Sequence, residues 1–277
     1  MEIKASTEIY CIFGNPVRHS LSPVIHNTAF GALGMDALYC AFEPESIENA
    51  VMAMRHLGIR GASVTIPFKV SVIPCLDGID PLARSIGAVN TLLNDNGTIT
   101  GYNTDGLGAV SPLEKRIGPL SGKKALVVGN GGSARAIAFA LLSRGARVVI
   151  AGRNPSRAAS LAADLGRSAR SSAIDSLDPG FMSEIDIVIN TTPVGMTPDT
   201  ESTPIEEKLL LPHHTVFDIV YSPARTRLLA LAEAKGCVVV RGVEMLVSQA
   251  LAQFKIWTGK DAPERQIYDS VDRHLKK

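Results

Sequence analysis

The sequence predicts a two-domain α/β protein with mainly parallel sheets covered by helices. Apolar, strand-like runs alternate with helical patterns along the chain, and this alternation restarts after a connector at 116–124. The second series opens with a glycine-rich turn between a strand and a helix. A chain of 277 residues, 45% of them apolar, is long enough to bury two modest cores.

The first series of elements fills the first hundred residues. Apolar runs bounded by turn residues predict strands at 9–14, 37–42, 61–66, 88–93 and 98–103. Helical patterns predict helices at about 23–33, 46–57 and 68–76. Parallel strands need such crossover connections, so this order favours a mainly parallel sheet.

The second series follows the connector RIGPLSGKK, whose Gly, Pro and Ser are typical of a loop. Its predicted strands are 125–129, 147–151, 185–190, 215–220 and 237–240. Helical patterns at about 244–258 and 264–276 end the chain.

The charge balance argues against two classes of partner. The 28 basic and 27 acidic residues leave a net charge of +1, so no overall field draws the chain to nucleic acid or to an anionic membrane. We therefore expect a small-molecule substrate.

The cysteines and the N-terminal sequence predict a compartment. Cys11, Cys40, Cys75 and Cys237 form neither a C-x-x-C pair nor a metal-ligand cluster, so we expect reduced thiols and no metal. The first residues lack a signal-peptide pattern, and no stretch approaches 18 uninterrupted apolar residues. We expect a cytoplasmic protein.

The glycine-rich turn follows the strand KALVVG and precedes the helical pattern RAIAFALLSRG. Gly129, Gly131 and Ala134 occupy the G-x-G-x-x-G/A positions, which allow a tight turn, close approach of a pyrophosphate and close helix packing. The same glycines also fit a tight turn that binds nothing. The strand–turn–helix context favours dinucleotide binding through backbone N–H groups. The predicted cofactor residues of this turn are Gly129, Asn130, Gly131, Gly132, Ser133 and Ala134.

The end of the next strand predicts the type of dinucleotide. An NAD-specific site would have an acidic residue there, for the ribose hydroxyls. This sequence has Arg153, Asn154 and Arg157 instead. Arginines grip a ribose 2′-phosphate in a forked geometry, so the pattern favours NADP(H), although a solvated basic loop would look the same.

Polar residues also follow strands of the first series. Lys69, Asn90 and Asp105 each lie at or just beyond a strand end, and ligands bind where the carboxyl ends of parallel strands meet. Each has a simpler explanation: a surface lysine, a turn amide and a helix N-cap. Similarly, Ser22 before Pro23 fits an N-cap with proline at N1, whereas Ser20 has less structural reason for its place.

Together these segments resemble the shikimate dehydrogenase family. The resemblance rests on FGNPVRHSLSP at 13–23, SVTIPFK at 63–69, IGAVNT at 86–91, GYNTDG at 101–106, GNGGSAR at 129–135, GR at 152–153 and MLVSQA at 245–250. Seven motifs in order span nearly the whole chain. Asn130, where alanine is common, and Glu244, near the C-terminal motif, depart from the family pattern.

The resemblance implies reversible reduction of 3-dehydroshikimate by NADPH, in the pathway to chorismate and the aromatic amino acids. It implies Lys69 and Asp105 as the catalytic acid–base pair. It also implies substrate contacts by Ser20, Ser22, Thr65, Asn90, Tyr221 and Gln249, and places Ile219 and Gly242 at the cofactor.

The family fold implies a division of the chain. A substrate-binding domain would comprise residues 1–105 and 243–277, with a Rossmann NADP-binding domain at 106–242 between them. The C-terminal helices would return to the first domain, which explains how Gln249 can reach the substrate. We expect a monomer or a homodimer.

Two alternative functions stay open. Quinate or aminoshikimate dehydrogenases are relatives of different specificity, and one sequence does not exclude the extra hydroxyl of quinate. A non-catalytic ligand-sensing relative would need binding but no proton donor, so the presence of both Lys69 and Asp105 argues against it.

Overall fold

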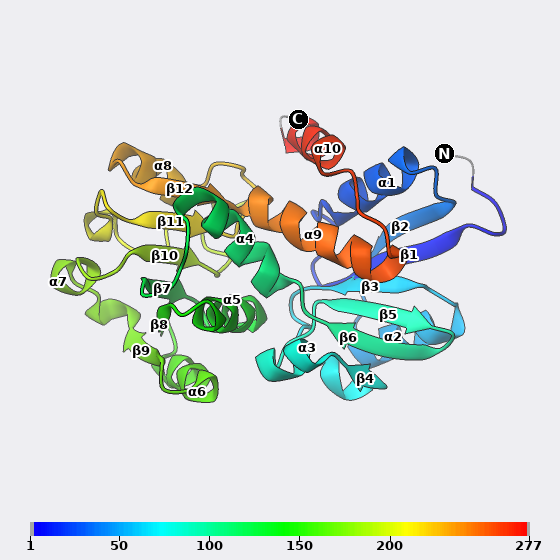
Figure 1. The fold of residues 1–277 in the computed structure, drawn as a ribbon, viewed down its shortest axis with the longest axis horizontal. Coiled ribbons are helices and arrows are strands. Elements are labelled where there is room, and N and C mark those ends of the chain that lie inside the picture. Colours follow the sequence, from blue (N-terminus) through cyan, green and yellow to red (C-terminus); the bar gives the residue numbers. More distant parts are fainter. Residues whose placement is uncertain (1–2, 276–277) are drawn as a thin grey trace. The chain divides into compact units, whose positions relative to one another are not determined.

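A computed structural model describes residues 3–275, and its chain divides into two compact α/β units (Figure 1). Unit 1 comprises the residues up to Thr104 and those from Gln249 onward, and unit 2 comprises Asp105–Ser248. The last residue of the predicted helix 264–276 lies outside the described residues.

Unit 1 contains a six-stranded sheet in the order β2-β1-β3-β5-β6-β4. Three strand pairs are parallel, β1 with β2, β1 with β3 and β4 with β6, whereas β5 runs antiparallel to β3 and β6. Its strands are β1 (Glu8–Phe13), β2 (Ala37–Phe42), β3 (Gly61–Val64), β4 (Gly78–Ile79), β5 (Thr91–Asp95) and β6 (Thr98–Tyr102). Its helices are α1 (Ser22–Ala32), α2 (Ile47–His56), the 3₁₀ turn η1 (Ile73–Cys75), α3 (Pro81–Ile86), the later part of α9 (Gly242–Thr258) and α10 (Glu264–Leu275).

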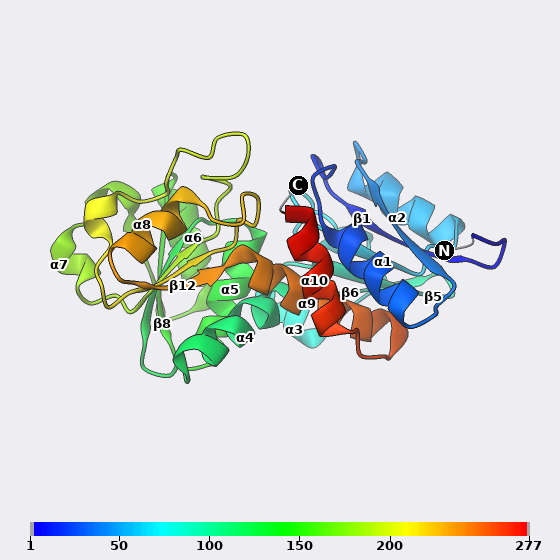
Figure 2. The same cartoon turned by 90° about the horizontal axis from the view of Figure 1, so that it is seen from above.

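Helix α1 packs against α10, from the other end of the sequence, as Figure 2 shows. Thr28 donates to the Ser270 hydroxyl at 3.0 Å across this contact. Helix α10 is therefore an integral part of unit 1.

The predicted helix at 68–76 is wrong. Only η1 forms in this segment, and the rest is turn. The segment contains β-branched Val70 and Val72, and Pro74 lacks the N–H that a continuing helix would use. The chain therefore leaves Lys69 on a turn rather than on a helix.

The predicted N-cap at Ser22 is also wrong. Helix α1 begins at Ser22 itself, and Leu21 occupies the cap position without a side-chain hydrogen bond. The hydroxyl of Ser20 instead accepts from the Ser22 N–H at 3.2 Å, so the upstream serine satisfies that donor.

Helix α3 was missed although its boundary signals are strong. Asp80 caps it by accepting from the N–H groups of Leu82 and Ala83, and Pro81 follows at the first helical position. Gly87 ends the helix in the left-handed region, with φ of 72°. A cap followed by Pro and a closing Gly could have predicted this short helix.

Unit 2 contains a fully parallel sheet in the order β12-β11-β10-β7-β8-β9. This is the doubly wound order of a Rossmann fold, with the switch point between β7 and β10. The strands are β7 (Lys124–Val128), β8 (Arg147–Gly152), β9 (Ala169–Ala173), β10 (Ile187–Asn190), β11 (Thr215–Asp218) and β12 (Val238–Arg241). The helical elements are α4 (Asp105–Ile117), α5 (Gly132–Ser143), α6 (Pro155–Leu165), η2 (Ile174–Ser176), α7 (Pro179–Met182), η3 (Glu207–Leu209), α8 (Arg227–Ala234) and the first turns of α9.

Strand β9 was missed because its sequence, ARSSA, is largely polar. It is the edge strand beside β8, where one side of the strand faces no sheet partner. Central strands such as β10, with the sequence IVIN, are buried along their whole length and read clearly as strands.

The contact between Gly61 and Trp257 gives a first prediction. A Cβ at Gly61 would lie 2.6 Å from the indole Cδ1 and Nε1 of Trp257, which is held in place by a 2.8 Å bond from Nε1 to the Leu92 carbonyl. Gly61→Ala should therefore destabilise the protein by about 1–3 kcal/mol through overpacking. Gly31→Ala, in helix α1 where an added Cβ meets no described atom within 4 Å, should stabilise by about 0.5–1 kcal/mol. Urea unfolding of both variants measures this, and equal effects would contradict the packing argument.

Candidate active site

The loop after β1 brings the two predicted serines together. The Ser20 hydroxyl donates to the Ser22 hydroxyl at 3.2 Å, and Ser22 is buried while Ser20 is half-buried. The Glu43 carboxylate stabilises this loop, because it accepts hydrogen bonds from the N–H groups of Val17 and Arg18 and from the Arg18 guanidinium. These bonds lower the pKa of Glu43, the Val17 N–H contributing most. Two neighbouring hydroxyls on a pinned loop suit a carboxylate ligand.

The turn that carries Lys69 is anchored to strand β1 and to the segment that precedes β5. The Thr65 N–H bonds the Phe13 carbonyl at 2.9 Å, and the Lys69 carbonyl accepts from the Val89 N–H at 2.8 Å. Gly14 approaches so closely that a Cβ there would overlap the Thr65 methyl. Thr65 and Lys69 are both half-buried. The backbone therefore fixes the position of Lys69 beside the segment that leads to Asn90.

Asn90 lies at the amino end of β5, which corrects the prediction of a strand over 88–93. Because β5 is antiparallel to β3, with Ser63 opposite Thr91, the amino end of β5 meets the carboxyl edge of β3. The carboxyl end of β6 reaches the same edge, since Thr91 is opposite Tyr102. Thr65, Asn90 and the residues after Tyr102 therefore share one edge of the unit 1 sheet.

The side-chain amide of Asn90 has a fixed orientation. Its Oδ1 accepts from the Thr104 N–H at 2.8 Å, a backbone donor that cannot reverse its role, and from the Thr91 hydroxyl at 2.8 Å. Its Nδ2 donates to the Thr104 hydroxyl at 3.0 Å and lies 3.5 Å from Gln249 Oε1. The sequence placed Asn90 and Gln249 together only by family resemblance, and the structure shows them in contact within unit 1.

A buried hydrogen-bond network of side chains that leads to Asn90 was not predicted from the sequence. Tyr39 donates to the Ser63 hydroxyl at 2.6 Å, and Ser63 donates to Gln253 Oε1 at 2.9 Å. Gln253 Nε2 donates in turn to the Asn90 carbonyl and the Thr91 hydroxyl, each at 3.1 Å. Gln253 follows Gln249 by four residues on α9, so both face the same side, and this spacing could have pointed to it.

His26 packs beside this network without a hydrogen-bond partner for either ring nitrogen among the described residues. Its ring stacks on Tyr39 with centroids 4.5 Å apart and lies 4.9 Å from the Trp257 ring. Burial lowers the pKa of His26 from 6.5 to about 3, although the nearby Gln253 side chain opposes this shift. His26 is therefore neutral at physiological pH.

The lowered pKa of His26 predicts loss of stability in acid. Since the unfolded state binds this proton more tightly, the contribution is present above pH 6.5 and is lost as the pH falls towards 3. The loss should reach about 2 kcal/mol at pH 5. The difference in unfolding free energy between wild type and His26→Phe, measured from pH 7 to pH 4, isolates this term. A difference that does not change with pH would contradict the assignment.

In unit 2 the glycine-rich turn lies at the switch point of the sheet. Gly129 has φ of 124°, and a Cβ there would overlap the Thr191 hydroxyl, so only glycine fits. Helix α5 begins at Gly132, and Ala134 in its first turn is fully buried. A Cβ at Gly131 would meet no described atom within 4 Å, so this backbone faces open space. Exposed backbone N–H groups at a helix N-terminus suit a pyrophosphate, and the residues fit a dinucleotide.

Arg153 and Arg157 are both exposed near the start of α6. Asn154 caps this helix by accepting from the Arg157 N–H at 3.1 Å. Asn130 Nδ2 would lie 3.0 Å from a Cβ on Gly152, so the glycine-rich turn packs directly on the end of β8. The two arginines and the pyrophosphate turn thus belong to adjacent strand ends, β8 and β7.

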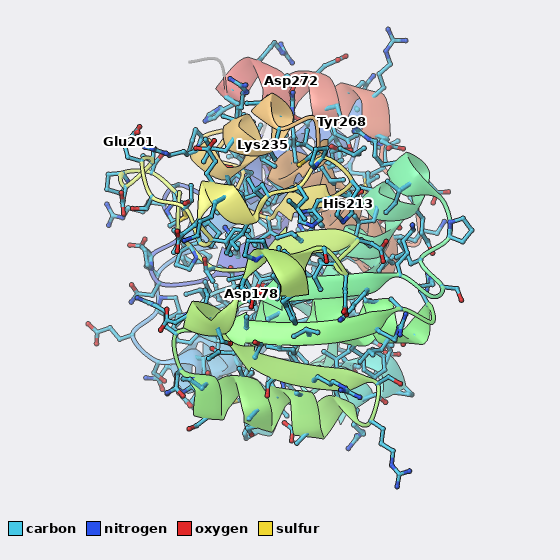
Figure 3. All side chains as sticks on the ribbon, turned by 90° about the vertical axis from the view of Figure 1, so that its left-hand side faces the viewer. Asp178, Glu201, His213, Lys235, Tyr268 and Asp272 are labelled. Carbon is cyan, nitrogen blue, oxygen red and sulfur yellow. The ribbon has the colours of Figure 1, made fainter. Side chains whose placement is uncertain are left out.

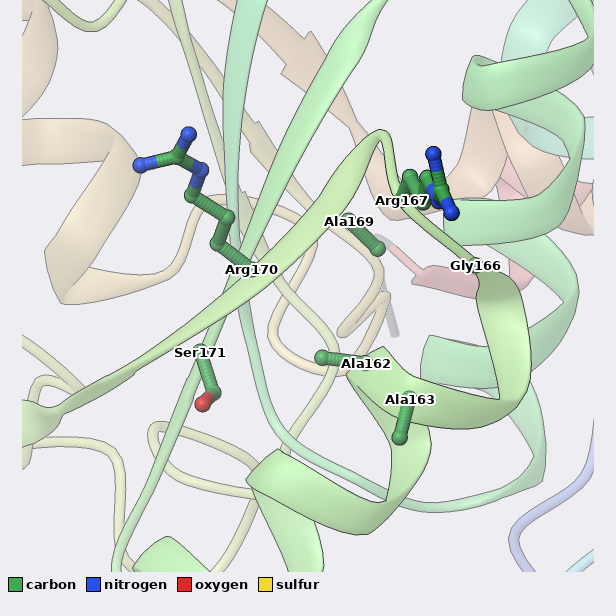
Figure 4. Close-up of a pocket in the computed structure, with 7 residues that line it drawn as sticks. All are labelled: Ala162, Ala163, Gly166, Arg167, Ala169, Arg170 and Ser171. Carbon is green, nitrogen blue, oxygen red and sulfur yellow. The ribbon is translucent and has the colours of Figure 1, made fainter.

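Two further arginines of unit 2, Arg167 and Arg170, lie at the other end of α6. A shallow hollow beyond the end of α6 is lined by Ala162, Ala163, Gly166, Arg167, Ala169, Arg170 and Ser171 (Figure 4). Figure 4 shows the side chains of Arg167 and Arg170 pointing away from one another, so they do not form a fork around one anion.

The carboxyl ends of β11 and β12 in unit 2 lead to three further predicted site residues, Ile219, Tyr221 and Gly242. A Cβ at Gly242 would overlap the Val220 carbonyl oxygen and lie 2.6 Å from the Ile219 carbonyl oxygen. Glycine at 242 therefore allows α9 to begin directly against the turn after β11. Tyr221 is half-buried in that turn.

Asp105 is the first residue of α4 and is 4% exposed. Gly106 beside it packs tightly on α5, where a Cβ would lie 3.0 Å from the Ala136 carbonyl oxygen. This contact fixes the start of α4, and with it the backbone of Asp105, against the helix that follows the glycine-rich turn.

Glu244 and the paired histidines have structural explanations. The Glu244 carboxylate accepts from the Arg241 N–H at 3.1 Å and from the Arg116 guanidinium, so it caps α9. His214 Nδ1 accepts from the Leu211 N–H and its Nε2 donates to the Met182 carbonyl, while His213, labelled in Figure 3, contacts the Ile185 carbonyl. No group of three or more metal-ligating side chains occurs among the described residues.

These features define a class: a two-unit α/β oxidoreductase whose second unit has the Rossmann strand order and glycine turn of a dinucleotide-binding fold. Family models for the shikimate dehydrogenase substrate binding domain match residues 12–92, for shikimate/quinate 5-dehydrogenase residues 112–209, and for the shikimate 5′-dehydrogenase C-terminal domain residues 242–271. The chain belongs to the shikimate dehydrogenase family.

Relatives support this over the full length. Shikimate dehydrogenase (NADP(+)) of Moorella thermoacetica is 44% identical over 271 residues, which are 95% of this chain and 92% of that protein. A crystal structure of a shikimate dehydrogenase in complex with NADP⁺ has a TM-score of 0.94 at 36% identity, covering 100% of this chain and 98% of that one. The Thermus thermophilus enzyme in complex with NADP(H) and shikimate has a TM-score of 0.87 at 35% identity, covering 96% and 99%.

In the part of the chain that the structure describes, no helix has the length and apolar character needed to cross a membrane.

Proposed function

We propose that this protein is an NADP-dependent shikimate dehydrogenase that reversibly reduces the C3 ketone of 3-dehydroshikimate. The observation that carries the proposal is the backbone bond between the Lys69 carbonyl and the Val89 N–H. This bond supports the proposal because it holds the backbone of Lys69, the candidate proton donor, beside the segment that leads to Asn90. A sensing protein would need the amide but not the donor.

Lys69 is the proposed acid of the reduction. Hydride transfer, supplied by bound NADPH, makes the ketone oxygen negative, and a protonated lysine within hydrogen-bond reach stabilises this charge and donates its proton to the oxygen. In shikimate oxidation the neutral lysine accepts the hydroxyl proton. Asp105 is the proposed second member of the acid–base pair.

The polar groups of unit 1 are proposed to hold the substrate. Ser20 and Ser22 offer adjacent hydroxyls to the substrate carboxylate. Thr65, Asn90 and Gln249 are proposed to bind ring hydroxyls. The bonds to the Thr104 N–H and the Thr91 hydroxyl fix which side of the Asn90 amide carries the oxygen, so its orientation towards a ligand would be defined.

The residues of unit 2 are proposed to bind the cofactor. The backbone from Gly129 to Ala134 would hold the pyrophosphate, and Arg153, Asn154 and Arg157 the 2′-phosphate side. Ile219 and Gly242 would border the nicotinamide, and Tyr221 would contact the substrate.

The experiment that tests this function is an absorbance assay of NADPH formation by purified protein. Shikimate with NADP⁺ is compared with quinate and with NAD⁺ in matched reactions. Turnover confined to shikimate and NADP⁺ supports the proposal. Equal or faster turnover of quinate would support the quinate dehydrogenase alternative. Folded protein that binds the ligands without turnover would favour a ligand-sensing function.

We also propose that the enzyme works in the cytoplasm, as a monomer or a homodimer. Cys11, Cys40, Cys75 and Cys237 are all free thiols, as expected for a reducing compartment. Size-exclusion chromatography with light scattering measures the assembly, and a larger oligomer would contradict the proposal.

A further inference from the structure

One buried carboxylate of unit 2 belongs to no predicted site. Asp218 ends strand β11 and is fully buried, and its register partner on β10 is Asn190. Asp218 Oδ1 accepts from Asn190 Nδ2 at 2.9 Å and from the Val220 N–H at 3.0 Å. Its Oδ2 accepts from the Thr226 hydroxyl at 2.7 Å. The carboxylate therefore joins three segments at the carboxyl edge of the sheet.

Each of these three segments has a defined place at that edge. Asn190 begins the loop NTTPVGM, and its Oδ1 accepts from both the N–H and the hydroxyl of Thr192. Thr191 bonds the Val128 carbonyl with its N–H and its hydroxyl, which ties the same loop to the glycine-rich turn. Thr226 caps helix α8 by accepting from the Leu229 N–H.

Val220 connects Asp218 to the proposed nicotinamide end. It lies between Ile219 and Tyr221, and Gly242 packs against the carbonyl groups of Ile219 and Val220. The turn is thus held on one side by the Asp218 carboxylate and on the other by the start of α9. Both predicted contacts of this turn depend on its backbone conformation.

A contribution to folding stability does not by itself explain why a carboxylate is buried at position 218. Burial raises its pKa to about 6, although its three donors oppose this shift, the Thr226 hydroxyl most strongly. A charge kept in the interior is costly unless it is fully hydrogen-bonded. Of its donors, Val220 lies in the turn that carries Ile219 and Tyr221, and Asn190 begins the loop that is tied to the glycine-rich turn.

We propose that Asp218 is a positioning residue that fixes the loop after β10 and the turn 219–221 for cofactor binding. The inference rests on the proposed function for the roles of Ile219 and Tyr221. It does not depend on which substrate the enzyme reduces.

Asp218→Asn tests the proposal, since it keeps the shape and removes the charge and one acceptor. We expect the dissociation constant for NADPH to rise about tenfold and kcat to fall. The dissociation constant for shikimate in the absence of cofactor should rise less, because Tyr221 is the one proposed substrate contact in this turn. Hydrogen exchange should accelerate in peptides covering 190–196 and 219–226. Asp186→Asn is the matched control, because Asp186 accepts from the Lys124 N–H at 2.7 Å at the opposite edge of the same sheet. It should leave NADPH binding unchanged.

A second pair of variants covers the case in which Asp218→Asn fails to fold. Thr226→Val removes one donor to the carboxylate, and Thr226→Ser restores it. The valine variant should weaken NADPH binding and the serine variant should recover it. Wild-type NADPH affinity and unchanged exchange in Asp218→Asn would overturn the proposal, as would equal weakening of NADPH and shikimate binding. If wild-type protein itself lacks turnover, the proposed function fails, and the exchange of 219–226 still decides the role of Asp218.

Discussion

Lys69→Met should lower kcat for shikimate oxidation by about 10²- to 10⁴-fold and leave the NADPH dissociation constant nearly unchanged. Methionine keeps the length and the apolar part of the side chain but cannot carry a proton. The turn itself should persist, because the bonds that hold it involve the backbone of Thr65 and Lys69. Steady-state kinetics with NADPH titration by fluorescence measures both quantities.

The control for this variant is Lys208→Met. Lys208 forms an exposed ion pair with Glu206 in unit 2, so its loss should change neither kcat nor cofactor affinity. Wild-type turnover in Lys69→Met would remove Lys69 from the mechanism. A parallel loss of turnover, NADPH affinity and unfolding temperature would instead indicate misfolding.

Replacing both Arg153 and Arg157 by alanine should raise the KM for NADP⁺ by about 10²- to 10⁴-fold, because charge-assisted bonds to a phosphate contribute about 1.5–3 kcal/mol each. The KM for NAD⁺, which lacks the 2′-phosphate, should stay close to its wild-type value. The variant would therefore lose its preference for NADP⁺. Both side chains are exposed, so the change should have little effect on folding.

Arg167→Ala is the matched control for the cofactor prediction. Arg167 is an exposed arginine just beyond the opposite end of α6 and should not affect either KM. If the double variant keeps its NADP⁺ preference, the 2′-phosphate is bound elsewhere. If the KM values for both cofactors rise equally, the arginines act through the pyrophosphate or through folding.

The sequence determined the class of the fold and most candidate residues. The buried strands of unit 2 are apolar along their length, so the sequence pattern predicts them as strands. The glycine-rich turn follows the first of them, which is its position in a dinucleotide-binding fold. The C-terminal return of Gln249 came from resemblance alone, because no local pattern reports a contact across 159 positions of the chain.

Only the tertiary structure decided the direction of β5 and the roles of the buried polar groups. An apolar run has the same pattern in either direction, so Asn90 appeared to end a parallel strand when it precedes an antiparallel one. Gln253 and Asp218 are polar residues that belong to no recognisable motif in the sequence. Their importance comes from burial beside specific donors and acceptors, and burial is a property of the packed units rather than of the local sequence.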